Sequence, residues 1–308
     1  MRVIFAGTPQ VALPSLRAII EAGHEVVAVL TRPDAPVGRG KKLTASPVAQ
    51  LAEELGLPVL KARRPDDELV ERLRGLDAEV AAVVAFGMLL SQPMLDAVSG
   101  GWVNLHFSLL PSWRGAAPVQ RAILAGDELT GATTFRIVRE LDAGPIYRTL
   151  STPIGDQETS GDLLDRLAVD GAQLLLDSLH DVQAGVAPTE QPADGVTLAP
   201  KINPADVRID WSAPAVEIDR LVRAANPAPG AWTLLAGERF QVLAVSVADS
   251  NRLAPGELAA DRRHLWVGTS DGDLELTRVK AFGRKPMPGA DWARGRQGGL
   301  EPGLRFDA

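Results

Sequence analysis

The sequence predicts an α/β fold: a Rossmann-like domain with a mostly parallel sheet, followed by a small C-terminal β-barrel of OB-like type. In the first half, short apolar runs alternate with amphipathic helical stretches, as in the βαβ units of a parallel sheet. In the last third, short strands are separated by Gly and Pro, as in a small barrel or sandwich. The length of 308 residues exceeds what one core usually serves, which favours two domains.

The apolar runs of the first half are expected to be parallel strands. They cover residues 3–6, 26–30, 57–60, 80–86 and 102–106. The run VAAVVAF at 80–86 is apolar throughout, which is typical of a strand buried on both faces. Helices are expected at about 12–22, from Pro47 with Ser46 as N-cap, and after Pro65-Asp66. The turn after the first strand lacks the G-x-G-x-x-G pattern, so it predicts no nicotinamide site.

The pattern changes after residue 132. Strands are expected at 133–138 and 146–153, then a long helix from the capping stretch at 159–162 to Gly185. Residues 186–206 are weakly periodic and predict a linker. A helix at 214–225 and strands at 232–235, 240–247, 264–268 and 273–281 follow. We therefore expect a catalytic domain at 1–187, a linker at 188–206 and a C-terminal barrel at 207–308.

Composition limits the chemistry. There is no cysteine, which excludes disulfides, Cys-ligated zinc and thiol nucleophiles, and the four histidines form no metal-binding motif, so no metal is expected. No apolar run reaches the ~18 residues that span a bilayer, and the first residues resemble no leader, so we expect a cytoplasmic protein. The net charge of −7 argues against bulk binding of nucleic acid but leaves room for a local basic patch.

The stretch NLHFSLLPSWRGAAPVQ, at residues 104–120, carries the candidate site. Asn104, His106 and Ser108 share one face of the predicted strand, because residues two apart point the same way. Buried polar groups need partners, and ligands of open α/β sheets bind beyond the carboxyl ends of strands. Position and chemistry therefore favour a reaction centre, although a lone core histidine bonded to a neighbour remains an alternative.

Asp142 is the expected third member of this site. It lies in the turn ELDAGP, at residues 140–145, after the strand predicted at 133–138. By itself it is a common turn aspartate. If the fold brings it to His106, its carboxylate would orient the imidazole and raise the pKa of His106, favouring the protonated form.

These motifs resemble the folate-dependent formyltransferases, and most closely the members that act on methionyl initiator tRNA. The resemblance rests on N-x-H-x-S-L-L-P-x-W-R-G-A-A-P followed by L-D-x-G-P. Further matching stretches occur in the same order, and they cover nearly the whole chain: FAGTP, RPDAPVGRGKKL, SPVAQLAEELGLPV, TSGDLLDRLA, KINPADVRIDWS and RAANPAPGAW. Phe107 replaces a frequent Gly, and Phe86 replaces a common Tyr.

The resemblance implies a bacterial enzyme that transfers a formyl group from 10-formyltetrahydrofolate to the α-amine of methionyl initiator tRNA, and we expect it to act as a monomer. Asn104 and protonated His106 would donate hydrogen bonds to the developing oxyanion, and Asp142 would keep His106 charged and help to relay protons. The folate needs an apolar slot with backbone groups at its pterin edge. The residues that the resemblance places there are Phe86, Gly87, Met88, Leu89, Ser108, Leu109, Leu110 and Pro111.

Two basic stretches are candidates for contact with tRNA. The Gly- and Pro-rich loop at 32–42 contains Arg39, Lys41 and Lys42, and the resemblance implies that it enters the end of the acceptor stem. Residues 278–305 hold seven basic and two acidic residues, an excess of five positive charges, and include Arg284 and Lys285. Such residues suit phosphate contacts, which position a nucleic acid without reading its sequence. Short charge runs are also common on solvated surfaces.

Three rival functions stay open at this point. A formyltransferase that acts on an amino-sugar nucleotide or a ribonucleotide would share Asn104, His106 and Asp142, but it would need neither the basic loop nor the second domain. A noncatalytic RNA-binding protein would not need these three residues. A dehydrogenase is disfavoured by the missing glycine pattern.

Overall fold

The computed structural model describes residues 1–38, 40–248, 250, 252–296, 299–301 and 303–307. The chain forms two compact units. The first comprises 1–118, 129–153 and 164–199, and the second comprises 119–128, 154–163 and 200–308. Two short stretches of the earlier part of the chain lie in the second unit. The exact domain boundaries expected from the sequence stay a prediction.

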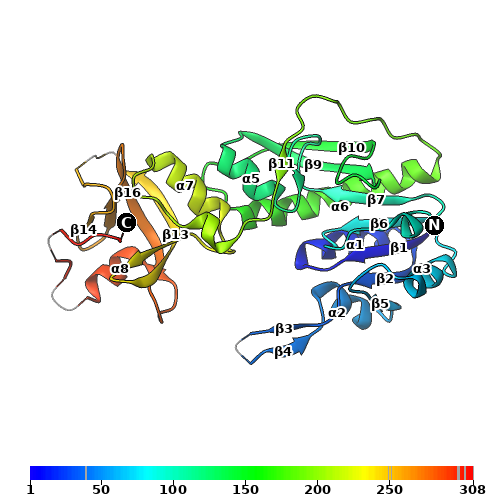
Figure 1. Ribbon diagram of the computed structural model, residues 1–308, viewed down its shortest axis with the longest axis horizontal. Helices are drawn as coiled ribbons and strands as arrows, with labels where there is room; N and C mark the ends of the chain where they lie inside the picture. The colour runs from blue at the N-terminus through cyan, green and yellow to red at the C-terminus, as the bar shows by residue number, and fades with distance from the viewer. Residues whose placement is uncertain (39, 249, 251, 297–298, 302, 308) are drawn as a thin grey trace. The chain divides into compact units, whose positions relative to one another are not determined.

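The first unit is built on a seven-stranded sheet in the order β10-β9-β7-β6-β1-β2-β5 (Figure 1). Its strands are β1 (Arg2–Gly7), β2 (Glu25–Thr31), β5 (Val59–Lys61), β6 (Val80–Val84), β7 (Trp102–His106), β9 (Leu129–Arg136) and β10 (Ile146–Pro153). Strands β5, β2, β1, β6 and β7 pair with their neighbours in a parallel manner. Strand β9 pairs in an antiparallel manner with both β7 and β10. The mostly parallel sheet is therefore confirmed.

Two helices of the first half begin directly after the residues that the sequence indicates, Ser46 and Asp66. The helices in this part of the chain are α1 (Leu13–Glu21), α2 (Pro47–Glu54), α3 (Asp67–Arg74), α4 (Gln92–Leu95), α5 (Pro118–Ala125) and α6 (Ser160–Gln183), with the short 3-10 helix η1 (Gln10–Ala12) before α1. Ser46 Oγ accepts a hydrogen bond from Ala49 N, and Asp66 Oδ1 accepts one from Leu69 N. These bonds satisfy amides that a helix start leaves free. Among the described residues, no helix combines the length and the apolar composition that a bilayer crossing requires.

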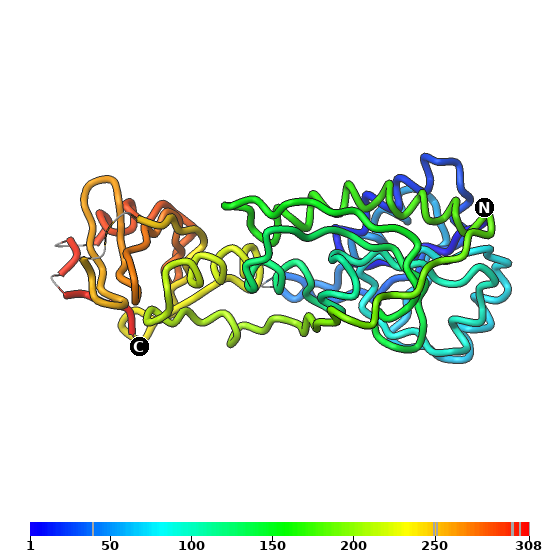
Figure 2. Tube along the Cα trace, turned by 90° about the horizontal axis from the view of Figure 1, so that it is seen from above, coloured from blue at the N-terminus to red at the C-terminus, as the bar shows by residue number. Residues whose placement is uncertain are grey.

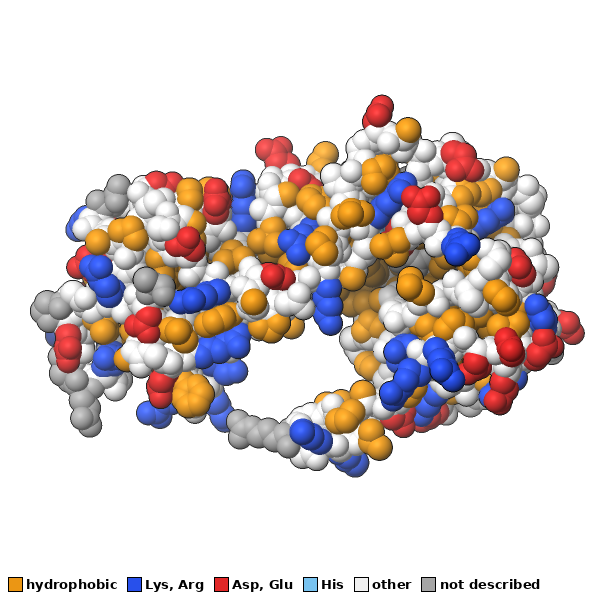
Figure 3. Space-filling model, viewed as in Figure 1, with side chains coloured by type: hydrophobic (Ala, Val, Ile, Leu, Met, Phe, Trp, Pro, Cys, Tyr) orange, Lys and Arg blue, Asp and Glu red, His pale blue; other side chains and the backbone are white. Residues whose placement is uncertain are grey.

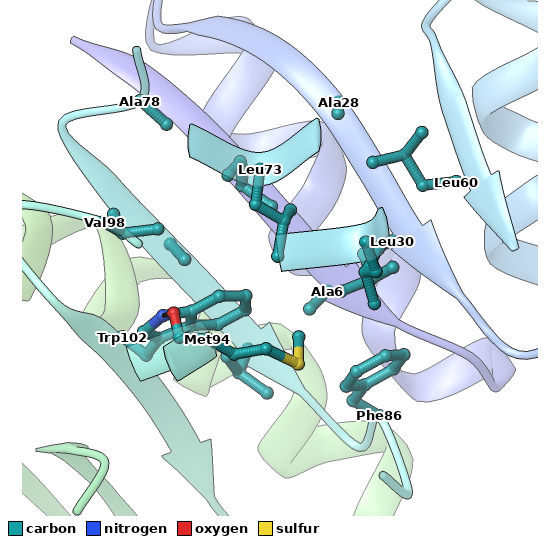
Figure 4. Packing of buried hydrophobic residues seen from close by; sticks show 14 of the residues in the cluster. Ala6, Ala28, Leu30, Leu60, Leu73, Ala78, Phe86, Met94, Val98 and Trp102 are labelled. Atoms are coloured by element: carbon teal, nitrogen blue, oxygen red, sulfur yellow. Dashed lines mark hydrogen bonds between the residues drawn. The ribbon is translucent and has the colours of Figure 1, made fainter. Parts of the chain in front are cut away.

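Alternation along the strands divides the core between the two faces of the sheet. Figure 4 shows the cluster on one face, where Leu73 of α3 and Met94 of α4 pack beside Trp102 of β7. On the other face, α6 approaches so closely that a Cβ at Gly171 would lie 2.9 Å from the Leu105 side chain. Asn104 and His106 therefore continue the Trp102 row, on the face of α3 and α4 and at the carboxyl end of β7.

The basic loop after β2 is a two-stranded hairpin, not an irregular loop. Strands β3 (Ala35–Val37) and β4 (Lys42–Thr44) pair in an antiparallel manner, and the hairpin projects from the end of β2 (Figure 1). Lys41 and Lys42 are exposed, and Figure 3 shows basic side chains on the outside of this hairpin. Arg39, the residue expected to enter the acceptor stem, lies outside the described residues.

The segment predicted as a linker is ordered against the first unit over much of its length. Residues 189–199, which we call the strap, follow an extended path (Figure 2). Thr189 exchanges two backbone hydrogen bonds with Ile146, and β11 (Leu198–Ala199) pairs in parallel with β8 (Arg114–Gly115). The sequence predicted a linker here because the residues that hold the strap in place are distant in the chain. No local pattern in the sequence shows such contacts.

The second unit contains an antiparallel sheet in the order β12-β13-β16-β15-β14, with β17 paired to β16. Its elements are β12 (Trp232–Leu235), β13 (Glu238–Ala248), β14 (Leu258–Ala260), β15 (Leu265–Gly268), β16 (Asp273–Lys280), β17 (Met287–Pro288), η2 (Pro204–Val207), α7 (Ala215–Ala224) and α8 (Gly289–Arg294). Asp307 forms a β-bridge with Leu234 of β12, and Arg305 forms one with Glu257, the residue before β14. The tail thus joins the two sheet edges, in agreement with a small OB-like barrel.

Candidate active site

The carboxyl end of β7 places Asn104 and His106 side by side on one face of the sheet. Asn104 pairs with Val83 on β6 and with Phe135 on β9, and His106 pairs with Thr133. His106 is 6% exposed, and the edge of its ring meets the Phe135 ring at a centroid distance of 6.4 Å. The face predicted from the alternation of polar and apolar residues is therefore the face observed.

Two acceptors face the imidazole of His106. Its Nε2 lies 2.9 Å from the Trp113 carbonyl oxygen, and its Nδ1 lies 3.8 Å from Asp142 Oδ2. A carbonyl can only accept, so Nε2 donates and carries a proton. In the neutral ring the lone pair then sits on Nδ1, on the side of Asp142. The fold thus brings together the His and Asp that the sequence pairs.

The charge state of His106 differs from the expectation. Burial lowers the pKa of His106 below its ordinary value, and this effect outweighs the Asp142 carboxylate and the Trp113 carbonyl, which both raise it. Asp142 acts in the predicted direction, but the predicted net rise was wrong because desolvation of the buried ring dominates. Burial therefore favours the neutral form of the resting imidazole.

Asp142 is presented by a strained turn. Its φ of 50° lies in the left-handed region, which is uncommon for a residue with a side chain. Its carboxylate accepts a hydrogen bond of 2.8 Å from Gly115 N. Two residues on, a Cβ at Gly144 would lie 1.7 Å from the Arg136 carbonyl oxygen, so only glycine fits there. The turn that carries Asp142 therefore requires glycine at position 144.

Asn104 is half-buried, and the structure records no hydrogen bond from its side chain to another described residue. Buried amides usually have partners, so an unengaged amide at a strand end is available to a ligand. Its NH2 group can donate hydrogen bonds to an oxygen that gains negative charge. This property is what an oxyanion site requires.

The stretch after β6 divides between core and surface. Phe86 is 3% exposed and packs within the cluster of Figure 4, whereas Leu89 is 79% exposed. Gly87 has a φ of 73°, and Met88 is half-buried. Backbone groups and the side chains of Met88 and Leu89 are thus accessible here. The side chain of Phe86 is buried in the hydrophobic cluster and packs beneath the end of β6, on the core side of this stretch.

The stretch after β7 is a tightly bonded turn. Ser108 is fully buried, and its hydroxyl donates to the Ser112 carbonyl at 2.6 Å. Leu110 is 6% exposed, and its amide donates to Thr133 Oγ1. Leu109 and Pro111 are half-buried. The Ser108 side chain is therefore engaged within the protein, while Leu109 and Pro111 remain accessible.

Two groups near the site were missed by the sequence reasoning. The loop at 112–115 supplies the Trp113 carbonyl to His106 and the Gly115 amide to Asp142. Gln191, from the strap, contacts both this loop and the Asp142 turn. The fixed W-R-G within the quoted motif was a signal for the loop. Nothing in the sequence around Gln191 indicated its position.

The predicted tRNA contacts lie at exposed positions of the separate units. Lys41 and Lys42 lie on the hairpin of the first unit. Arg284 and Lys285 are exposed in the turn between β16 and β17 of the second unit. Each pair is accessible to a polyanion.

Comparisons with known proteins identify the family of the chain. Residues 1–179 match the family described as Formyl transferase, and residues 201–297 match Formyl transferase, C-terminal domain. HypX from Aquifex aeolicus in complex with tetrahydrofolic acid has a similar fold (TM-score 0.67, 19% identity), covering 95% of this chain and 46% of that chain. An N-formyltransferase from Helicobacter canadensis gives a TM-score of 0.69 at 17% identity, over 92% of this chain and 100% of that chain. The chain is a member of the formyl transferase family.

Sequence relatives narrow the assignment. Methionyl-tRNA formyltransferase of Acidothermus cellulolyticus is 55% identical, covering 100% of both chains. The enzyme of the same name from Streptomyces coelicolor is 54% identical over 96% of each chain. Within the formyl transferases, the chain belongs to the methionyl-tRNA formyltransferase family.

Proposed function

We propose that this enzyme transfers the formyl group of 10-formyltetrahydrofolate to the α-amine of methionyl initiator tRNA in the bacterial cytoplasm. The observation that carries the proposal is the site geometry. Nδ1 of the buried His106 faces the Asp142 carboxylate. Asn104 lies two residues before His106 on the same strand, and its side-chain amide has no recorded hydrogen bond to another described residue. Full-length similarity to methionyl-tRNA formyltransferases supports the choice of acceptor.

His106 takes the proton of the attacking amine. The neutral amine attacks the formyl carbon, so a new N–C bond forms and the amine must lose a proton. The lone pair of Nδ1 is the acceptor on His106, because Nε2 donates to Trp113. The imidazolium that results is stabilised by Asp142 and can return the proton to the N10 nitrogen as the C–N10 bond breaks. The sequence of steps is acyl transfer without a covalent enzyme intermediate.

Asn104 stabilises the negative charge that develops on the formyl oxygen. Its amide NH2 donates a hydrogen bond, and the imidazolium formed at His106 adds a positive charge nearby. The half-buried position of Asn104 limits competition by water, which strengthens such a bond. The three side chains thereby divide the work into oxyanion binding, proton transfer and charge compensation.

The two turns at the sheet edge are proposed to hold the folate. Exposed Leu89 and half-buried Met88 supply apolar contact on one side, and Leu109 and Pro111 supply it on the other. The backbone around Gly87 offers donors and acceptors for the pterin edge. Phe86 and Ser108 serve the site by supporting these turns.

Basic residues of both units are proposed to contact tRNA phosphates, namely Arg39, Lys41, Lys42, Arg284 and Lys285. The exposure of the two lysines on a projecting hairpin supports this role for the first unit. Arg39 is included on its sequence position alone. Each contact would release counterions, so binding should weaken as salt increases.

The test is formyl transfer from 10-formyltetrahydrofolate to methionyl initiator tRNA, compared with methionyl elongator tRNA and with an amino-sugar nucleotide. We expect rapid transfer to the initiator tRNA, much less to the elongator tRNA and none to the sugar. Transfer to the sugar nucleotide alone would replace this proposal with the rival formyltransferase. Tight tRNA binding without formyl transfer would indicate a noncatalytic RNA-binding protein.

A further inference from the structure

Gln191 forms four hydrogen bonds that join two loops of the active site. Its Nε2 donates to the carbonyl oxygens of Asp142 and Gly144, each at 2.8 Å. Its Oε1 accepts from Arg114 Nε at 3.2 Å and from a terminal nitrogen of Arg114 at 2.7 Å. Both amide hydrogens and both acceptor positions of the side chain are therefore used.

The two loops that Gln191 joins are the ones that contact the reacting side chains. The first loop gives the Trp113 carbonyl to His106 and the Gly115 amide to Asp142. Trp113 and Asp142 have φ angles of 63° and 50°, so both loops hold left-handed residues that carry side chains. Such conformations persist only where surrounding contacts fix them.

We propose that Gln191 is a positioning residue that holds Asp142 at His106 by clamping the Asp142 turn to the Arg114 loop. The inference deepens the proposed function, because it rests on the roles assigned above to Asp142 and His106. Gln191 acts through Asp142 and touches neither substrate nor the reacting atoms. Because Gln191 belongs to the strap, this segment, which the sequence predicted to be a linker, contributes to the active site.

The chemistry of the amide explains why glutamine is needed. A glutamate would keep the acceptors for Arg114 but turn an anionic oxygen toward two carbonyl oxygens. A methionine would keep the length and lose every hydrogen bond. The rest of the strap is attached independently, since Trp113 N donates to Thr197 Oγ1 at 2.8 Å and Arg114 N donates to Thr197 O at 2.9 Å. Substitution of Gln191 should therefore leave the strap attached.

The first experiment measures steady-state kinetics of the full chain with Gln191→Met and Gln191→Glu. Gln173→Met is the matched control, because Gln173 is an exposed glutamine with one side-chain bond, to Asp177. We expect kcat to fall about tenfold to hundredfold in both Gln191 variants, as for a displaced catalytic group. KM for folate and tRNA and the melting temperature should change little. A kcat equal to that of the control would overturn the proposal.

The second experiment repeats Gln191→Met in an Asp142→Asn background. If Gln191 acts through Asp142, its substitution should reduce kcat less than twofold there, so the two effects are far from additive. Full additivity would mean that Gln191 acts elsewhere and would reject the inference. A fully active Asp142→Asn single variant would instead reject the proposed role of Asp142, which separates the two failures.

Discussion

Nδ1 of His106 lies 3.8 Å from Oδ2 of Asp142, although 36 residues separate them in the chain. The distance is longer than a direct hydrogen bond, so Asp142 influences the ring through its charge. Both side chains are largely buried, at 7% and 16% exposure, where screening by water is weak. The carboxylate is therefore placed to stabilise the positive charge that His106 gains when it accepts a proton during the reaction. The resting ring, whose pKa is lowered by burial, is favoured in its neutral form.

Removal of either reacting side chain should abolish most turnover. We expect Asn104→Ala and His106→Ala each to lower kcat by at least about 10²-fold, since one oxyanion donor is worth that much. Folate binding, measured by fluorescence or calorimetry, should change little. Turnover near that of the wild type in either variant would remove that residue from the mechanism.

Asp142→Asn should move the pH profile toward acid as well as lower the rate. The carboxylate raises the pKa of His106, and without it burial lowers that pKa further. If neutral His106 is the base, the acidic limb of kcat/KM lies at the pKa of His106 in the free enzyme. The limb should therefore shift to lower pH in Asp142→Asn. An acidic limb that does not move would remove His106 as the titrating base, and a His106-dependent alkaline limb in its place would show that the protonated ring is the active form.

Stability should depend on pH through His106. Its folded-state pKa lies below the unfolded value of 6.5, so the unfolded chain binds the proton more readily. The contribution is complete above pH 6.5 and is lost as pH falls toward the folded-state pKa. Urea unfolding from pH 8 to pH 5 should show this decline, and His106→Gln should show a smaller one. Equal declines in both proteins would contradict the assignment.

Gly144→Ala should destabilise the first unit strongly. A Cβ there would lie 1.7 Å from the Arg136 carbonyl oxygen, so the Asp142 turn must move. We expect a loss of at least about 3 kcal/mol in the free energy of unfolding, in the range of severe backbone conflicts. Gly75→Ala is the control, because its nearest contact would be 3.6 Å and its φ is −69°. That control should change stability by less than about 0.5 kcal/mol.

The hairpin lysines should contribute to the salt dependence of tRNA binding. Lys41→Ala with Lys42→Ala should raise KM for tRNA and reduce the slope of log affinity against log salt by about one per lost phosphate contact. KM for folate should not change. Arg72→Ala with Arg74→Ala, in the last turn of α3, is the charge-matched control. The same slope in both double variants would exclude the two hairpin lysines from the contact with tRNA. Arg39→Ala extends the test to the third basic residue predicted in this stretch.

Much of the parallel sheet could be predicted because its strands carry local patterns. The strands at 102–106 and 146–153 have the bounds expected, and Gly185, with a φ of 70°, follows the end of α6 as predicted. The run at 80–86 was too long by two residues, because Ala85 turns into the left-handed region and ends β6. Apolar periodicity and capping residues are local features, so they can be found in one sequence.

The details of the site depend on distant contacts, and these could not be predicted. The alternation around His106 gave its face, but not the Trp113 carbonyl that fixes the protonated nitrogen. The pairing with Asp142 suggested a raised pKa for His106, but burial of the ring has the larger effect and lowers that pKa. Gln191 gave no local signal, because its role exists only once two loops meet it.

The strap also has a consequence for how the protein is made. A fragment that ended at residue 187, the domain boundary expected from the sequence, would contain Asn104, His106 and Asp142 but not the strap. During synthesis, these three residues are likewise added to the chain before Gln191. If Gln191 positions Asp142 as proposed, each newly made molecule reaches full activity only after its chain has extended well past the last residue that does the chemistry.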